Sequence, residues 1–304
     1  MIRSTAVRFF PLVAMVTVAA AALPNAALPA AVRADDPADP VRADPVRMVL
    51  DLLAADDADL RCIGLDGVRH AVKGSEATYR IAAVLSKLPP ASQAALIAAF
   101  ADRGDAAAIP AITATLLAAR DPAVRTAAIR ALGTLGSGME VALLKKCLAG
   151  DEPDRTTARR SLVVVRGRDT AKQLAEAAKY GDPALRPTFV EILAERRERA
   201  VAPELLVLAA GDDGATRVAA VRALTALGGT AELGGLVDVL LKAAAGERGE
   251  LEKAVVAICT TNRGHAESAA AFSERFKAAA EPEREILLPT LSRIGGSAAP
   301  AVVE

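Results

Sequence analysis

The chain has 304 residues, of which 52% are hydrophobic but only 3% aromatic, and it contains no Trp. A single globular core of this length normally uses large aromatic side chains, so the composition favours many helices with small side chains that pack closely together. The formal net charge is zero, which excludes an overall electrostatic attraction to nucleic acid or to an anionic membrane.

Residues 1–34 have the pattern of a secretory signal peptide. Arg3 and Arg8 form a positive region, and an apolar stretch that is short for a membrane span follows over residues 9–23. Val32-Arg33-Ala34 fits the small-x-small cleavage rule, and retention as an uncleaved anchor is the alternative. Residues 35–44 are acidic and rich in proline, which predicts a disordered acidic linker. We therefore expect an exported protein, periplasmic or extracellular.

From residue 45 onward the sequence repeats with a period of 30 to 34 residues, the signature of a repeat array. The clearest unit, DPAVRTAAIRALGTLG, spans residues 121–136, and residues 213–228 are a near copy. The eight repeated motifs begin, in chain order, at Asp57, Pro89, Asp121, Asp151, Asp182, Asp213, Glu247 and Ala280. Each motif predicts a helix, called the second helix of its unit, because apolar residues recur three and four apart.

Two positions that are apolar in nearly every unit support these second helices; the residues that share one position in successive units are called a column. The position of Leu132 is occupied in chain order by Val68, Phe100, Leu132, Leu162, Leu193, Leu224, Ile258 and Leu291. The position three residues earlier holds Leu65, Ile97, Ile129, Arg159, Val190, Val221, Val255 and Leu288. Arg159 interrupts the second column, so we expect the fourth unit to be rotated or irregular.

An apolar first helix is predicted before each second helix, for example over residues 106–119, 141–148, 171–179, 203–209, 233–241 and 269–276. Asp121 and Asp182 can cap the first turn of a second helix, with Pro following at the first helical position. The glycines that follow four of the second helices predict a left-handed residue at the helix end: Gly104, Gly136, Gly228 and Gly295. No segment alternates with a strand period, so the chain is predicted to be all-α.

The run DPAVRTAAIRALGTLG resembles the second helix of a HEAT repeat, of the short HEAT-like type also found in phycobilisome lyase subunits. The resemblance covers almost all of residues 45–304. It implies a right-handed superhelical solenoid of about eight two-helix repeats, whose second helices line a concave surface. Residues 297–304 look like the beginning of a ninth unit, so the last repeat is expected to be incomplete and the C-terminal end apolar.

The sequence offers little for catalysis. His70 and His265 lie in the first and seventh units, too far apart in a solenoid to share a metal or a proton. Deoxyhypusine hydroxylase, a HEAT-like enzyme, holds iron through His-Glu pairs, and no His-Glu dipeptide occurs here. The three cysteines lie in separate units and are expected to be small buried hydrophobes: Cys62, Cys147 and Cys259. We therefore expect no catalytic residue, no metal and no cofactor.

An acid and an arginine recur four residues apart near the start of the second helices, a spacing that brings them to one helix face. These residues are Asp57, Arg61, Asp121, Arg125, Asp151, Arg155, Asp182, Arg186, Asp213 and Arg217, and Arg284 shares the arginine column. The resemblance implies a structural ladder that links neighbouring repeats. A stripe that binds a partner is the alternative.

A second arginine position is the candidate site for a partner. Arg130, Arg160 and Arg222 share it, and Arg159 is adjacent. The resemblance places it on the concave surface, where the planar guanidinium can pair with carboxylates; a solvated polar face is the alternative. Basic residues outnumber acidic ones over residues 121–179, which favours an acidic peptide as partner. The scarcity of aromatic residues disfavours nucleic acid.

The leading hypothesis is an exported, non-catalytic scaffold that binds a protein or peptide on its concave face. The alternatives are a structural envelope component or non-catalytic module of a larger complex, and a lyase-like or chaperone-like enzyme. No membrane span is expected after signal cleavage, and the C-terminal repeat is expected to cause self-association.

Overall fold

The computed structural model describes residues 44–295. The predicted signal peptide, the linker apart from Asp44, and the incomplete ninth unit lie outside the described residues, so these predictions remain untested. Within residues 44–295 the secondary structure is helical and no strand is formed. None of the helices found there is long and apolar enough to cross a membrane.

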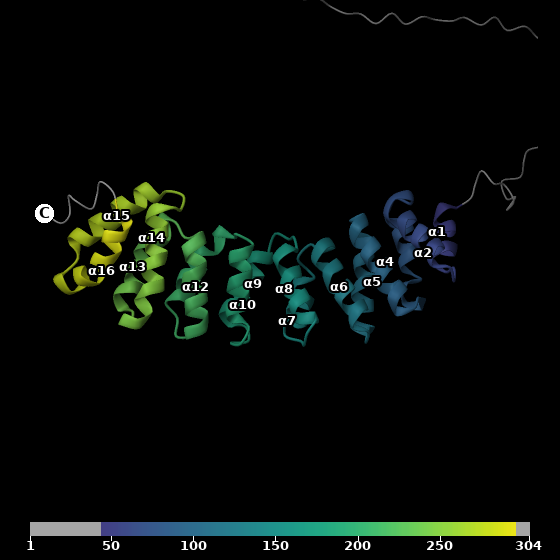
Figure 1. The fold of residues 1–304 in the computed structure, drawn as a ribbon, viewed down its shortest axis with the longest axis horizontal. Helices are drawn as coiled ribbons and strands as arrows, with labels where there is room; N and C mark the ends of the chain where they lie inside the picture. Colours follow the sequence, from purple (N-terminus) through teal and green to yellow (C-terminus); the bar gives the residue numbers. More distant parts are fainter. Residues whose placement is uncertain (1–43, 296–304) are drawn as a thin grey trace, which may run out of the picture. The chain divides into compact units, whose positions relative to one another are not determined.

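Within residues 44–295, sixteen α-helices form eight hairpins that follow one another in chain order (Figure 1). The first helices of the hairpins are α1 (Pro45–Leu53), α3 (Ser75–Ala82), α5 (Ile109–Ala118), α7 (Val141–Leu148), α9 (Thr170–Tyr180), α11 (Ala202–Ala209), α13 (Thr230–Lys242) and α15 (His265–Ala278). The second helices are α2 (Ala58–Asp66), α4 (Pro90–Arg103), α6 (Pro122–Leu135), α8 (Asp154–Val164), α10 (Arg186–Glu195), α12 (Gly214–Leu227), α14 (Arg248–Thr260) and α16 (Glu281–Ile294).

The hairpins stack through like helices. Second helices pack on second helices, as α4 does on α6 and α6 on α8, and first helices pack on first helices, as α11 does on α13. One hairpin cannot bury its own apolar face, so the stacking supplies the core. The all-α solenoid predicted from the sequence is confirmed.

The column of Leu132 forms the centre of this core. All eight of its members are buried, with at most 2% of each residue exposed. In the second column Ile97, Ile129, Val190, Val221 and Val255 are buried and Leu65 is partly buried. Arg159, which interrupts the column, reaches across to α10 and forms ion pairs with Glu191 and Glu195. Leu288, in the last described unit, is 48% exposed.

Polar side chains also join neighbouring units. Arg196, at the end of α10, donates hydrogen bonds to the carbonyl oxygens of Leu162, Val163 and Val165, at the end of α8. Asn262 does the same for α12, with its amide 2.8 Å from the carbonyl oxygen of Gly228. The last carbonyl oxygens of a helix have no hydrogen-bond donor within that helix. The side chains of Arg196 and Asn262 supply the donors that these oxygens would otherwise lack between the stacked units.

Two second helices begin later than predicted. Six of the eight predicted first residues are the N-caps of their helices. The exceptions are Asp151 and Asp182, because the N-caps of α8 and α10 are Pro153 and Leu185. In α10 the cause is Pro187, which has no N–H to donate to the carbonyl of residue 183. The chain from Asp182 to Leu185 therefore forms a turn before the regular helix starts.

Two of the four helix-end glycines also differ from the prediction. Gly104 and Gly295 have positive φ values of 74° and 65°, whereas Gly136 and Gly228 leave their helices with φ of −63°. A Cβ atom at Gly228 would lie 2.7 Å from the carbonyl oxygen of Leu224 in its own hairpin and 2.8 Å from Cδ1 of Ile258 in the next unit. Glycine fits there because of these close contacts, and not because of a left-handed conformation.

Candidate functional site

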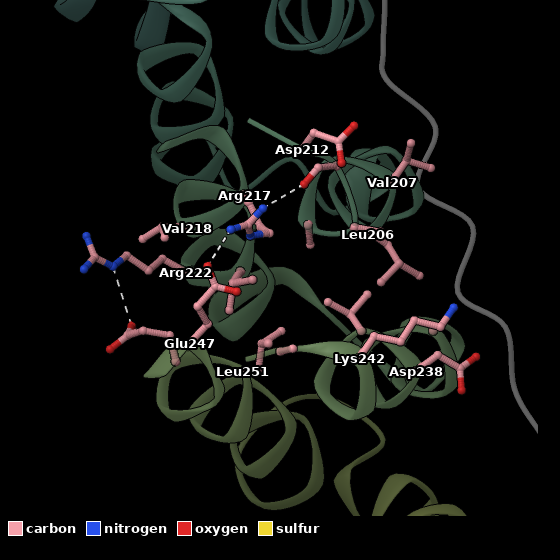
Figure 2. Close-up of a pocket in the computed structure, with 18 of the residues that line it drawn as sticks. Leu206, Val207, Asp212, Arg217, Val218, Arg222, Asp238, Lys242, Glu247 and Leu251 are labelled. Carbon is pink, nitrogen blue, oxygen red and sulfur yellow. Dashed lines mark hydrogen bonds and ion pairs between the residues drawn. The ribbon is translucent and has the colours of Figure 1, made fainter. Parts of the chain in front are cut away.

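A groove of about 730 Å³ lies between the sixth and seventh hairpins, among α11, α12, α13 and α14 (Figure 2). Its walls come from the end of each first helix, the turn that follows, and the first half of each second helix. The volume falls in the range of about 300–1,000 Å³ that is typical of ligand-binding pockets. It is the strongest candidate site in the described part of the chain.

Small residues leave this space open. Ala209, Ala210, Ala243 and Gly246 line the groove where longer side chains would fill it. On α13, Gly235 allows Leu206 of α11 to approach closely, because a Cβ atom at Gly235 would lie 2.5 Å from Cδ2 of Leu206. The side chain of Leu206 therefore packs against the backbone of α13 at Gly235, and both residues line the hollow.

Aliphatic side chains form the floor of the groove. Val221 and Leu251 are buried beneath it, whereas Val207 and Val218 line it while 55% and 40% exposed. Figure 2 shows Val207 on α11 and Val218 on α12. Exposed valines in a concave surface offer apolar area that a partner could bury at roughly 25 cal/mol per Å².

Charged side chains surround this floor, and most of them are paired. Arg217 donates to the carbonyl oxygen of Gly211 at 3.1 Å and to Glu247 at 2.6 Å. Lys253 lies 2.7 Å from Glu250, and Arg222 lies 3.5 Å from the same carboxylate. The hydrogen bond and charge of Lys253, together with Arg222, lower the pKa of Glu250 and keep it ionised.

Three other charged groups line the groove. Asp238 is paired with Arg275 of α15. Asp212 and Lys242 are exposed, and neither forms an ion pair with another residue of the described chain. The lining therefore combines aliphatic surface with carboxylate, guanidinium and ammonium groups.

The four arginines predicted to bind a partner are not gathered into one site. Arg130 lies on α6, Arg159 and Arg160 on α8, and Arg222 on α12. Arg130 and Arg160 are exposed and form no ion pair within residues 44–295, whereas Arg159 is engaged by Glu191 and Glu195. Arg222 is the member that lines the groove, with 67% of its side chain exposed.

The recurring acids and arginines do not pair within their helices as their spacing predicts. Asp57, Asp121 and Asp213 instead accept hydrogen bonds from backbone N–H groups in the first turn of their own helices, as in Asp121 Oδ1 to Ala123 N at 2.8 Å. Asp182 accepts from Ala184 N at 3.0 Å. Each carboxylate can accept a hydrogen bond either from the free N–H groups of the first turn or from the arginine one turn away. It accepts from the N–H groups because they lie closer.

The arginines of this column turn back toward the preceding first helix. Every one of them donates to a backbone carbonyl at or near the end of that helix, through Arg61 to Ala55 and Asp56, Arg125 to Leu116 and Ala119, Arg155 to Gly150, Arg186 to Gly181, Arg217 to Gly211, and Arg284 to Lys277. A cation is favourable at a helix C-terminus, where the carbonyls are unpartnered. The column therefore closes the turn between the two helices of each hairpin.

Some of these arginines also reach the next unit. Arg125 Nε lies 2.7 Å from Asp154, Arg186 lies 3.9 Å from Asp213, and Arg217 contacts Glu247. These links join neighbouring repeats. Asp213 belongs to the predicted column of acids, whereas Asp154 and Glu247 do not.

The cysteines differ from one another. Cys147 and Cys259 are buried as expected, but Cys62 on α2 is exposed, so the expectation is wrong for that residue. Burial raises the pKa of the Cys259 thiol to about 12 and also raises that of Cys147. Within the described residues, no group of three or more His, Cys, Asp or Glu side chains is placed to hold a metal ion.

Comparison with protein families agrees with the helical-repeat fold. Residues 79–163 match the family of HEAT repeats. Among solved structures, human deoxyhypusine hydroxylase in complex with glycerol is similar, with 19% sequence identity and a TM-score of 0.34; the match covers 82% of this chain and 95% of that one. No curated protein matches the chain.

Proposed function

We propose that this chain, whose residues 79–163 are HEAT repeats within an all-α solenoid, is an exported, non-catalytic scaffold that holds a protein partner. The partner binds in the groove between the sixth and seventh hairpins. The exposed arginines of the second helices, Arg130 and Arg160, provide further contacts.

The groove is the observation that carries this proposal. Val207 and Val218 hold about half of their surface in solvent inside a concavity of about 730 Å³. Protein partners commonly anchor apolar side chains in such hollows and place polar groups around the rim. The charged residues around these valines supply that rim.

Export is proposed from the sequence of residues 1–34, with their positive start, apolar stretch and small-residue cleavage site. The partner would then be another protein outside the cytoplasm.

Photo-crosslinking in the cell tests the proposal. A photoreactive amino acid is placed at Val207 or Val218 in the groove, and at Val164 or Leu117 as controls. Both control residues are apolar and exposed, at 57% and 70%, and neither lines the groove. We expect both groove positions to capture the same exported protein and the controls to leave it uncaptured.

The captured protein must then bind the purified chain directly. Capture of that protein from groove and control positions alike, or a captured protein that shows no direct binding, would contradict the proposal.

A further inference from the structure

We infer that the groove between α11 and α14 takes an extended peptide segment in which aliphatic side chains alternate with acidic ones. This inference rests on the proposed function and names the chemistry of its partner. The balance of charges around the aliphatic floor supports it.

The carboxylates of the groove are largely neutralised by cations of the chain itself. Glu247 is held by Arg217 at 2.6 Å, Glu250 by Lys253 at 2.7 Å, and Asp238 by Arg275. A basic partner would have to displace these cations. The acids of the rim are therefore poor sites for a partner's lysine or arginine.

The cations that remain available are Arg222 and Lys242. Arg222 is 67% exposed, and its contact with Glu250 is 3.5 Å long and shared with Lys253, which lies closer. Lys242 ends α13, is exposed, and forms no ion pair within residues 44–295. Asp212 is the single exposed acid of the lining without such a pair. The available charge of the groove is thus net positive.

The positions of the two cations suggest how a peptide would lie. Figure 2 shows Arg222 and Lys242 on opposite sides of the groove, with Leu251 between them in the view. In an extended chain, side chains of alternate residues point to the same side, about 7 Å apart. Aliphatic side chains on one side can enter the floor while acidic side chains on the other reach the rim cations.

Defined peptides test this inference by fluorescence anisotropy. The probe is labelled Asp-Val-Glu-Val-Asp-Val-Glu with blocked ends. One comparison peptide carries Lys in place of each acid, and another carries Ser in place of each Val. We expect the acidic aliphatic peptide to bind at least tenfold more tightly than either, and its affinity to fall as salt concentration rises.

Charge-reversal variants identify the residues responsible. The double variant Arg222→Glu/Lys242→Glu should lose at least tenfold in affinity for the acidic peptide and gain affinity for the basic one. Arg166→Glu, an exposed arginine outside the groove, should change neither. Circular dichroism checks that each variant remains helical.

Two outcomes would overturn the inference while leaving the proposed function standing. One is equal binding of acidic and basic peptides, with both weakened by Val218→Asn. The other is no binding of any peptide while the groove positions still crosslink to one protein. If neither a peptide binds nor a partner is crosslinked, both proposals fail.

Discussion

At the scale of single residues, the recurring aspartate and arginine serve two separate purposes. The aspartates cap the second helix, and the arginines close the turn before it by binding carbonyl oxygens of the first helix. Both contacts satisfy backbone groups that a helix leaves unpartnered at its ends. Their spacing of four residues therefore does not reflect a contact between the two side chains.

Arg125 is the member of this column on which stability should depend most. It joins two carbonyl oxygens of its own hairpin to Asp154 of the next one, and the Asp154 side chain is only 13% exposed. Arg125→Ala should lower the free energy of unfolding by about 2–3 kcal/mol, because it leaves a largely buried carboxylate without its cation. Urea denaturation followed by circular dichroism measures the change.

Arg160→Ala is the matched control, since Arg160 is exposed and unpaired within the described chain. It should change the free energy of unfolding by less than about 0.5 kcal/mol. Equal stability of the two variants would show that the Arg125 contacts do not hold the hairpins together.

The thiols should react in two classes. Cys62 is exposed, whereas Cys259 is 2% exposed and burial raises its pKa to about 12. The thiolate is the reactive form, so native protein at pH 8 should release one equivalent of thionitrobenzoate rapidly from Ellman's reagent and two more only in denaturant. Rapid reaction of all three thiols in native protein would contradict the packing of α7 and α14.

At the scale of elements, most of the fold could be predicted from the period and the apolar columns. The position of Leu132 is buried in every unit because three- and four-residue spacings place it toward the first helix. The prediction fails where local chemistry competes with the period. Pro187 delays α10, and Gly228 is present for close packing and not for its backbone freedom.

The groove could not be predicted in the same way. It depends on where a small residue of one hairpin faces a larger side chain of the next, as Gly235 faces Leu206, and on the distance between α11 and α13. Of the four arginines predicted to bind a partner, Arg222 alone lines it, and Arg217 of the recurring acid-and-arginine pattern lines it as well. In the sequence, Val207 and Val218 look like any other apolar residue of the core. Only the structure shows that they are exposed.

Two glycines inside helices should respond oppositely to alanine. A Cβ atom at Gly133 of α6 would lie 2.6 Å from the Cβ atom of Ser161 on α8, whereas one at Gly234 of α13 would meet nothing within 4 Å. Gly133→Ala should therefore destabilise the protein by about 1–3 kcal/mol. Gly234→Ala should stabilise it by about 0.5–1 kcal/mol, because alanine loses less entropy in a helix.

Thermal and urea unfolding of the two variants can be compared directly. A stabilising Gly133→Ala would contradict the close contact between α6 and α8.

At the scale of the whole molecule, the end units differ from the inner ones. On α16, Leu288 is exposed beside exposed Glu281, Glu285 and Ser292, so this surface of the helix combines one leucine with polar groups. On α2 of the first unit, Leu60 and Ile63 are 42% and 56% exposed. Solenoid ends need polar surfaces to prevent association.

Self-association should therefore depend more on the first unit than on the last. We expect Ile63→Lys to reduce concentration-dependent association in sedimentation velocity more than Leu288→Lys does, because a lysine removes apolar contact area from the more apolar end. A larger effect of Leu288→Lys would support the C-terminal association expected from the sequence.

The central claim is that the groove between the sixth and seventh hairpins binds the partner. Its most direct test is the affinity of the crosslinked partner, once purified, for three forms of the chain in titration calorimetry. These are the unaltered chain, the groove variant Val207→Asn/Val218→Asn, and the control Val164→Asn. All three altered valines are exposed, so the variants should remain folded.

We predict that the groove variant binds the partner at least tenfold more weakly, corresponding to about 1.4 kcal/mol or more, while the control binds as the unaltered chain does. Equal affinities of the groove variant and the unaltered chain would contradict the claim and place the partner on another surface of the solenoid.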